Sequence, residues 1–240
     1  MAKVTVEEFA QQVSGALGDR LVALLLYGSA ARGTHAPGRS DVNTLLICTA
    51  VDDALFGALE APVRAWTRDT AHPAHPAPLV LTEREWRDSA DAFPIEYEEM
   101  REAHRLLAGR DPWQGIAVRR EDVRRQLEYE LLAKLVRLRQ AYAASWSDSG
   151  RLTEAVAGSA AGLLTMLRSV LRLTGATPPA APDALVREAA GRIGFAPGAL
   201  DDVLAHVRGE RRLALGNHDA RAVAYLDVVA RTTEFVNRLT

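Results

Sequence analysis

Apolar residues in the first part of the chain follow two different spacings. Over residues 5–17 they recur every three or four positions, which is the period of a helix, and Gly18 follows as a stop signal. Leu21–Tyr27 and residues 42–49 are instead continuous apolar runs of strand length. These patterns predict a helix followed by two buried strands, with a loop rich in glycine and proline between the strands.

The same succession of helices and strands continues to about residue 100. Residues 52–69 carry apolar side chains on one face of a predicted helix, and residues 79–81 form a third short strand. Thr82 and Glu85 have the spacing of a capping box, so we predict that another helix begins there. Residues 93–100 fit a strand and a helix equally well.

After residues 109–112 the apolar positions follow a helical period throughout. The predicted helices cover residues 119–146, 152–174, 183–193, 199–213 and 219–239. The sequence therefore predicts two domains. Residues 1–115 form an α/β (α+β) domain with a small mixed sheet, and residues 116–240 form an all-α helical bundle domain.

The composition is that of an ordinary soluble globular protein, with 48% apolar and 25% charged residues among 240. We expect no membrane span, because no apolar run approaches about 20 residues, and no signal peptide, because the N-terminal segment lacks an apolar core. The single Cys48 lies in an apolar run and is expected to be a small buried hydrophobe. We therefore predict a cytoplasmic protein, and its net charge of −2 gives no indication of nucleic-acid binding.

A Gly-Ser pair lies where the first predicted strand ends. Gly28 can adopt backbone angles that other residues avoid, and its missing side chain lets a phosphate approach the main chain closely. Ser29 adds a hydroxyl donor, and free N–H groups at the start of a helical turn favour an anion. Arg32 could pair with a phosphate, and Gly33 permits a sharp exit from the turn. An ordinary strand–turn–helix connection explains these residues equally well.

An acid at the start of the second strand makes the pattern more specific. Asp41 follows Gly28 by thirteen residues and could lie beside the turn. The Gly-Ser pair, the loop and this acid resemble the signature of the polymerase-β-like nucleotidyltransferase superfamily, which is Gly-Ser, a loop, and Asp-x-Asp on the second strand. The resemblance is close over residues 21–47, including Arg32, Gly33 and Ser40, and looser over the rest of the first domain. The helical part looks like the substrate-side bundle of small bacterial members such as antibiotic nucleotidyltransferases.

The resemblance implies a magnesium site, from which this sequence departs at one position. In that family two Mg²⁺ ions are held by the Asp-x-Asp pair and a third acid. Asp41 matches the first position, but Asn43 occupies the second. Alternate strand positions put both side chains on one face, yet a neutral amide cannot bridge two cations as a carboxylate does. If the loss resembles removal of one preorganised stabilising group, the rate falls about 10²–10³-fold.

The sequence does not identify which residue is the third acid. The third predicted strand carries no carboxylate until Glu83 at its end. Glu96 lies within an apolar stretch and is the best substitute, because a buried acid needs a partner or a function. Glu98 and Glu99 are rivals, and a structural salt bridge is the alternative role for Glu96.

Two further groups of residues have simpler interpretations. His72 and His75 lie in a proline-rich loop with no other ligand at metal-binding spacing, so we expect both to be exposed loop side chains. Arg124 and Lys134, on the predicted helix 119–146, could meet triphosphate oxygens, but a solvated helix face is the simpler expectation.

Three functions fit these residues. The first is a Mg²⁺-dependent nucleotidyltransferase that moves a nucleoside monophosphate from an NTP to a hydroxyl of a small molecule or a protein. The second is a degenerate family member that binds a nucleotide, or a partner protein, without turnover. The third is an interaction scaffold in which the motif has no remaining function. Because Gly28, Ser29, Arg32 and Asp41 are all present, we favour the transferase, with an activity lowered by Asn43.

Overall fold

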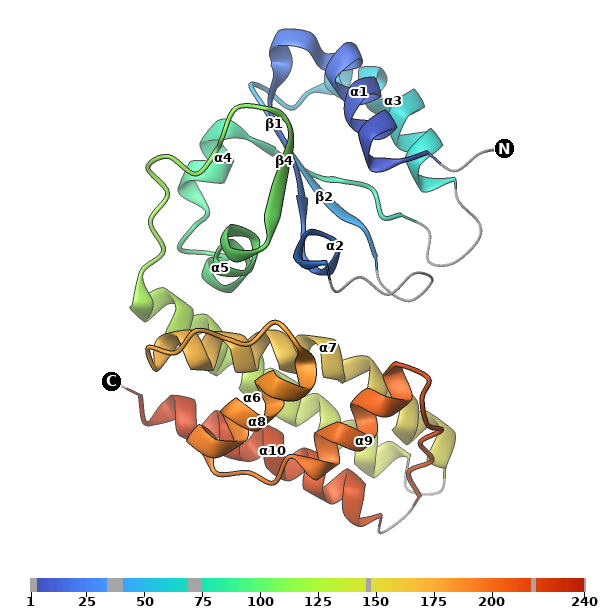
Figure 1. Ribbon diagram of the computed structural model, residues 1–240, viewed down its shortest axis with the longest axis vertical. Coiled ribbons are helices and arrows are strands. Elements are labelled where there is room, and N and C mark those ends of the chain that lie inside the picture. The colour runs from blue at the N-terminus through green and yellow to red at the C-terminus, as the bar shows by residue number, and fades with distance from the viewer. Residues whose placement is uncertain (1–3, 34–40, 69–74, 146–147, 217–218, 240) are drawn as a thin grey trace. The chain divides into compact units, whose positions relative to one another are not determined.

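The computed structural model describes residues 4–33, 41–68, 75–145, 148–216 and 219–239 (Figure 1). The chain divides into two compact units, Met1–Val118 and Arg119–Thr240. The boundary lies slightly beyond residue 115, the predicted end of the first domain.

The first unit contains both helices and strands. In chain order its elements are α1 (Val6–Leu17), the short 3₁₀ helix η1 (Gly18–Arg20), β1 (Leu21–Tyr27), α2 (Ser29–Arg32), β2 (Asn43–Cys48), α3 (Asp53–Thr67), β3 (Leu79–Thr82), α4 (Glu83–Asp88), α5 (Pro94–Glu102) and β4 (His104–Gly109). The capping box predicted before α4 is present. The Thr82 hydroxyl accepts from the backbone N–H of Glu85 at 3.1 Å, and the Glu85 carboxylate accepts from the backbone N–H of Thr82 at 2.7 Å.

The strands of the described residues form one mixed sheet in the order β3-β2-β1-β4. β1 pairs antiparallel with both β2 and β4, and β2 pairs parallel with β3. Figure 1 shows α1 and α3 on one face of this sheet and α4 and α5 on the other. β1 and β2 are therefore covered on both faces, which explains why their sequences are apolar at successive positions instead of alternating.

The end of this unit differs from the sequence expectation. The ambiguous stretch 93–100 is helical, and α5 begins with Pro94, whose fixed φ suits the first position of a helix. β4 is not predicted, because His104–Gly109 is neither a continuous apolar run nor an alternation of apolar and polar residues. A Cβ atom on Gly109 would lie 2.2 Å from the carbonyl oxygen of Val22, so only glycine lets β4 approach β1 this closely.

The two faces of the sheet bury different side chains. The α1/α3 face is mainly aliphatic, with Trp66 stacked on Phe9 at 4.6 Å between ring centroids. The α4/α5 face has a second aromatic stack, in which Trp86 and Tyr97 lie 4.2 Å apart. Each helical layer thus has its own core, separated from the other by the sheet.

One histidine of the proline-rich loop belongs to the core. The ring of His75 stacks on Trp66 at 4.0 Å between centroids and is only 7% exposed. The expectation of an exposed side chain is therefore wrong for His75, because its ring covers the face of the indole. His72 lies outside the described residues.

The described residues of the second unit form a helical bundle. Its helices are α6 (Arg120–Ala144), α7 (Ser149–Leu173), α8 (Pro182–Ile193), α9 (Gly198–Val207) and α10 (Ala220–Asn237). They match the predicted helices, except that α9 ends at Val207 and not at residue 213. α7 packs against α6, α8, α9 and α10, so it forms the centre of the bundle.

The central position of α7 also explains its composition. By length and composition, α7 is apolar enough to cross a membrane. However, 56% of its apolar window is buried against the rest of the protein, as in the core helix of a soluble bundle. The polar residues interspersed along α7 break it into short apolar runs, which is why the sequence shows no long one.

Candidate functional site

The Gly-Ser turn directly follows β1 and lies between two glycines with positive φ angles. Gly28 has a φ of 78°, and its N–H donates to the carbonyl oxygen of Ala103 at 3.1 Å. Ser29 begins α2, a single helical turn that ends at Gly33 with a φ of 74°. Both glycines therefore have backbone angles that residues with side chains rarely adopt.

Asn43 lies against this turn. It begins β2 and pairs with Tyr27, the last residue of β1. Its side-chain nitrogen Nδ2 lies 3.7 Å from the position that a Cβ atom on Gly28 would take. The structure thus brings the Asn43 amide next to the bare main chain of Gly28.

Asp41 precedes β2, and its side chain is exposed. Val42, between Asp41 and Asn43, is buried in the core of the α1/α3 face. Because successive side chains of an extended chain point to opposite sides, Asp41 and Asn43 are directed away from that core. One carboxylate and one amide are therefore directed to the same side at the start of β2.

Arg32 has carboxylate partners on α5. Its Nη2 donates to Glu99 Oε2 at 2.7 Å, and its Nη1 donates to Glu102 Oε1 at 3.1 Å. The Arg32 side chain is 9% exposed. The guanidinium is therefore largely buried and already paired with anions, which differs from the expectation that it pairs with a phosphate. The same contact gives Glu99, a rival for the third acid, a structural partner.

Glu96 is not the buried acid that the sequence predicts. It lies in the first turn of α5 and is exposed, whereas its neighbours Ile95 and Tyr97 are buried. Successive helical residues point about 100° apart, so an acid between two buried residues can still face solvent. Within the described parts of the chain, no three His, Cys, Asp or Glu side chains lie together in a group that could hold a metal.

A polar aromatic cluster on the α4/α5 face is not predicted by the sequence. The Nε1–H of Trp113 donates to His104 Nε2 at 3.0 Å, and its ring lies edge-on to Trp86. The Arg101 guanidinium lies 5.2 Å from the centroid of the Trp113 ring and donates to the carbonyl oxygen of Ile116 at 2.7 Å. These contacts fix the segment after β4 against α5. The aromatic residues are visible in the sequence, but their spacing does not show that they meet.

The basic candidates on α6 have partners within the second unit. Arg124 pairs with Glu128 at 2.9 Å. Lys134 is half-buried against α7, where its Nζ donates to the carbonyl oxygen of Ser159 at 3.2 Å. Burial lowers the pKa of Lys134. The expectation of a solvated helix face is therefore wrong for Lys134.

Cys48 lies inside the sheet, as the apolar run around it predicts. It is fully buried in β2, and burial raises its pKa to about 11. The thiol therefore stays protonated at neutral pH, as expected of a small buried hydrophobe.

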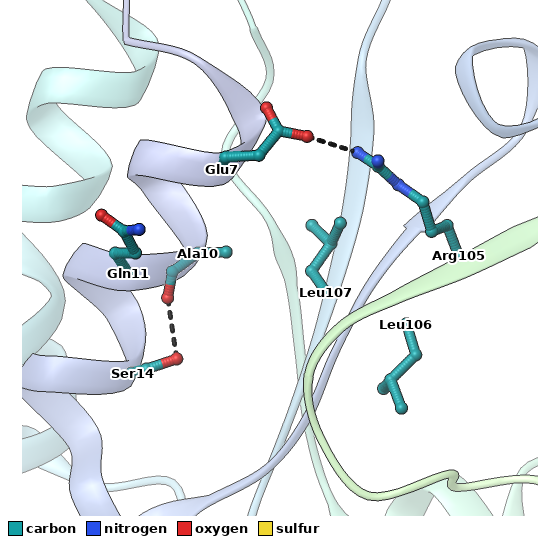
Figure 2. Close-up of a pocket in the computed structure, with 7 residues that line it drawn as sticks. All are labelled: Glu7, Ala10, Gln11, Ser14, Arg105, Leu106 and Leu107. Carbon is teal, nitrogen blue, oxygen red and sulfur yellow. Dashed lines mark hydrogen bonds and ion pairs between the residues drawn. The ribbon is translucent and has the colours of Figure 1, made fainter.

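The recess drawn in Figure 2 lies between α1 and β4. It has a volume of about 490 Å³ and is lined by Glu7, Ala10, Gln11, Ser14, Arg105, Leu106 and Leu107. Glu7 and Arg105 form an ion pair at 2.9 Å. A backbone hydrogen bond and this guanidinium lower the pKa of Glu7. The lining contains no residue of the Gly-Ser turn or of the start of β2.

Comparisons with known proteins confirm the fold. No family model matches the chain, and no curated protein matches it in sequence. A similar solved structure is that of spectinomycin adenyltransferase AAD(9) from Enterococcus faecialis with ATP and spectinomycin. The TM-score is 0.60 at 13% sequence identity, and the match covers 95% of this chain and 99% of AAD(9). The likeness confirms the predicted fold class, a nucleotidyltransferase-like domain followed by a helical bundle domain.

Proposed function

We propose that this chain is a nucleotidyltransferase that binds an NTP at the Gly28–Ser29 turn and transfers its nucleoside monophosphate to a hydroxyl of a small molecule. The observation that carries the proposal is the Asn43 amide placed against the Gly28 turn. The fold supports it, because AAD(9) is an adenyltransferase whose structure contains ATP and a small molecule. ATP is therefore the first donor to test, and a cytoplasmic location fits this donor.

The turn can bind phosphates through its main chain and two side chains. The first N–H groups of a helical turn have no partner within that turn, and here they follow a glycine without a side chain. The Ser29 hydroxyl and the Asn43 Nδ2 offer two further donors near this main chain. We assign these groups to the β- and γ-phosphates, which form the leaving group.

The residues present fit one Mg²⁺ better than two. Asp41 offers an exposed carboxylate and Asn43 a neutral carbonyl oxygen. Proteins commonly bind Mg²⁺ through one or two carboxylates together with substrate phosphates, so Asp41 and Asn43 would hold an ion that arrives with the NTP. When bound, such an ion neutralises charge on the phosphates and polarises the α-phosphate.

The proposed reaction is an in-line displacement at the α-phosphorus. The hydroxyl oxygen of the acceptor forms a bond to this phosphorus and releases its proton to water. The bond between the α-phosphorus and the oxygen that bridges to the β-phosphate breaks, and pyrophosphate leaves with the electron pair. Residues 28 and 29 contribute by holding the leaving group in position.

A second candidate function is nucleotide binding without turnover. Two observations favour it: Asn43 is neutral, and within the described parts of the chain no group of three metal-ligating side chains is present. A binding module of this kind would hold the NTP through the turn and would depend little on the metal.

Calorimetric titration with ATP, GTP, CTP and UTP, each with Mg²⁺ and with EDTA, tests both functions. If the protein is a transferase, NTP binding by the wild type should be weaker in EDTA than in Mg²⁺. The Asp41→Asn variant should then bind the NTP with the same affinity in both buffers. Binding by the wild type that EDTA leaves unchanged supports the second candidate. If no NTP binds in either buffer, both proposals fail.

A further inference from the structure

We propose that Glu99 and Glu102 of α5 are positioning residues for the turn at residues 28–33, and that they act through Arg32. The inference rests on the proposed function, because it concerns how the NTP-binding turn is held in place. It assigns Arg32 to the support of the turn, whereas the sequence pattern alone suggests a phosphate ligand.

The first support is the ion-pair network at the end of α2. The Arg32 guanidinium donates through separate nitrogens to Glu99 at 2.7 Å and to Glu102 at 3.1 Å. A planar guanidinium suits this task, because its donors are fixed in a fork that can bridge two carboxylates. Two negative charges face one positive charge, so Arg32 keeps no unbalanced charge to offer a phosphate.

Burial adds to the strength of this network. Arg32 is 9% exposed and Glu99 is 17% exposed, whereas Glu102, at 34%, lies nearer to the solvent. Charged groups that are shielded from water interact more strongly than surface pairs and are screened less by salt. The network joins Arg32 of α2 to two residues of α5 that lie 67 and 70 positions further along the chain.

The second support is a main-chain contact at the other end of the turn. Gly28 N–H donates to the carbonyl oxygen of Ala103 at 3.1 Å, and Ala103 N–H in turn donates to the carbonyl oxygen of Glu99 at 3.1 Å. The last turn of α5 therefore holds the 28–33 turn at Gly28 and again at Arg32. Loosening either contact should leave the phosphate-binding groups less well placed.

An alternative role for Arg32 makes the opposite prediction. If Arg32 left its carboxylates to meet the phosphates of a bound NTP, Glu99 and Glu102 would be competitors of the NTP. Removing their charges would then free Arg32 and tighten NTP binding. If they are positioning residues, the same change loosens the turn and weakens NTP binding.

The double variant Glu99→Gln, Glu102→Gln separates these two roles. We would measure amide hydrogen exchange in residues 27–33 of the full chain, and the Kd for ATP with Mg²⁺ by calorimetry. Loss of charge-assisted hydrogen bonds should speed exchange in the turn about ten- to hundredfold and raise the Kd about tenfold or more. Glu60→Gln is the matched control, because Glu60 forms an exposed ion pair with Arg64 on α3.

Exchange in the turn that stays at the wild-type rate, or tighter ATP binding, would overturn the proposal. If the wild type binds no NTP, the proposed function fails, and the exchange measurement alone still decides whether α5 holds the turn. Arg32→Lys provides a second variant in case the double variant does not fold. It keeps the charge but cannot bridge both carboxylates, so exchange in the turn should be faster than in the wild type. Weaker ATP binding by Arg32→Lys with wild-type exchange would indicate a direct phosphate contact and overturn the proposal.

Discussion

The two faces of the sheet differ in the hydrogen bonds that accompany their packing. The α1/α3 face is held mainly by close packing of apolar side chains around Trp66. Each face has an indole N–H that donates to a proline carbonyl oxygen, Trp66 to Pro76 at 3.1 Å and Trp86 to Pro112 at 2.9 Å. The α4/α5 face adds the Tyr97 hydroxyl, which donates to the carbonyl oxygen of Trp86 at 2.5 Å. The contacts that hold the Gly-Ser turn also come from α5. The comparison indicates that both faces of the sheet are covered mainly by packing, whereas the turn is held by hydrogen bonds from the α4/α5 side.

The largest expected effect is a loss of stability when the core of the α1/α3 face is disrupted. Trp66→Ala removes a side chain that is 1% exposed and stacks on two rings, so we expect a loss of about 3–5 kcal/mol in the free energy of unfolding. Urea unfolding followed by circular dichroism would measure it. Phe56→Ala on the same helix is the control, since Phe56 is 54% exposed. If the two variants lost the same free energy of unfolding, packing around Trp66 would not be what stabilises this face.

The next effect concerns chemistry at the site. Asn43→Asp supplies the second carboxylate that two-metal transfer needs, so the rate should rise about 10²–10³-fold in Mg²⁺. Pyrophosphate release from ATP, measured across a panel of hydroxylated small molecules, would detect the change. The control is Asn43→Asp in EDTA, where no gain is expected. A gain of less than a few-fold in Mg²⁺ would count against the transferase and favour nucleotide binding without turnover.

A smaller effect tests the directional bonds of the α4/α5 face. Tyr97→Phe keeps the ring stack with Trp86 but leaves the Trp86 carbonyl without this hydroxyl donor. We expect a loss of about 1–2 kcal/mol in the free energy of unfolding. Tyr129→Phe, at a side chain that is 71% exposed, should leave stability unchanged. If both variants match the wild type in urea, directional bonding on this face matters less than packing.

The smallest effect is a pH dependence on the α1/α3 side. The side-chain hydrogen bond from Arg20, followed by the backbone N–H of Leu55, lowers the pKa of Asp52 from its usual 3.8. A depressed folded pKa stabilises the protein above the unfolded pKa, and this contribution is lost as the pH falls through the lower folded value. Asp52→Asn keeps a good helix cap but removes the ion pair. Its Tm should lie slightly below that of the wild type at pH 7, and the difference should shrink below pH 3.8. Equal Tm values at pH 7 would show that Asp52 acts as a cap alone, and a difference that stays constant with pH would show that the charge of Asp52 is not its cause.

Local patterns were sufficient to predict most of the elements. β1 is visible as an apolar run because both of its faces are covered, and α4 is visible from the Thr82–Glu85 capping box. β4 could not be predicted, because its pairing with β1 depends on the close approach at Gly109 and not on a pattern within the strand. His75 could not be placed either, since its burial depends on the distant ring of Trp66.

The candidate site was harder to predict than the fold. The spacing from Gly28 to Asp41 suggested that the turn and the second strand meet, and Asn43 does lie against Gly28. Glu96 was placed wrongly, because an apolar neighbourhood in sequence does not bury every residue of a helix. The partners of Arg32 lie 67 and 70 residues away, so no local pattern could reveal them. The roles of these residues toward an NTP stay predictions.

The contact between Trp113 and His104 also fixes where a proton resides. An indole N–H can only donate, so His104 Nε2 must accept, and the imidazole hydrogen must be on Nδ1. That nitrogen lies 2.9 Å from the carbonyl oxygen of Met100, which accepts the hydrogen. Both ring nitrogens of His104 are thereby engaged. The ring of His104 therefore ties β4 to the last turn of α5 and to the segment that carries Trp113.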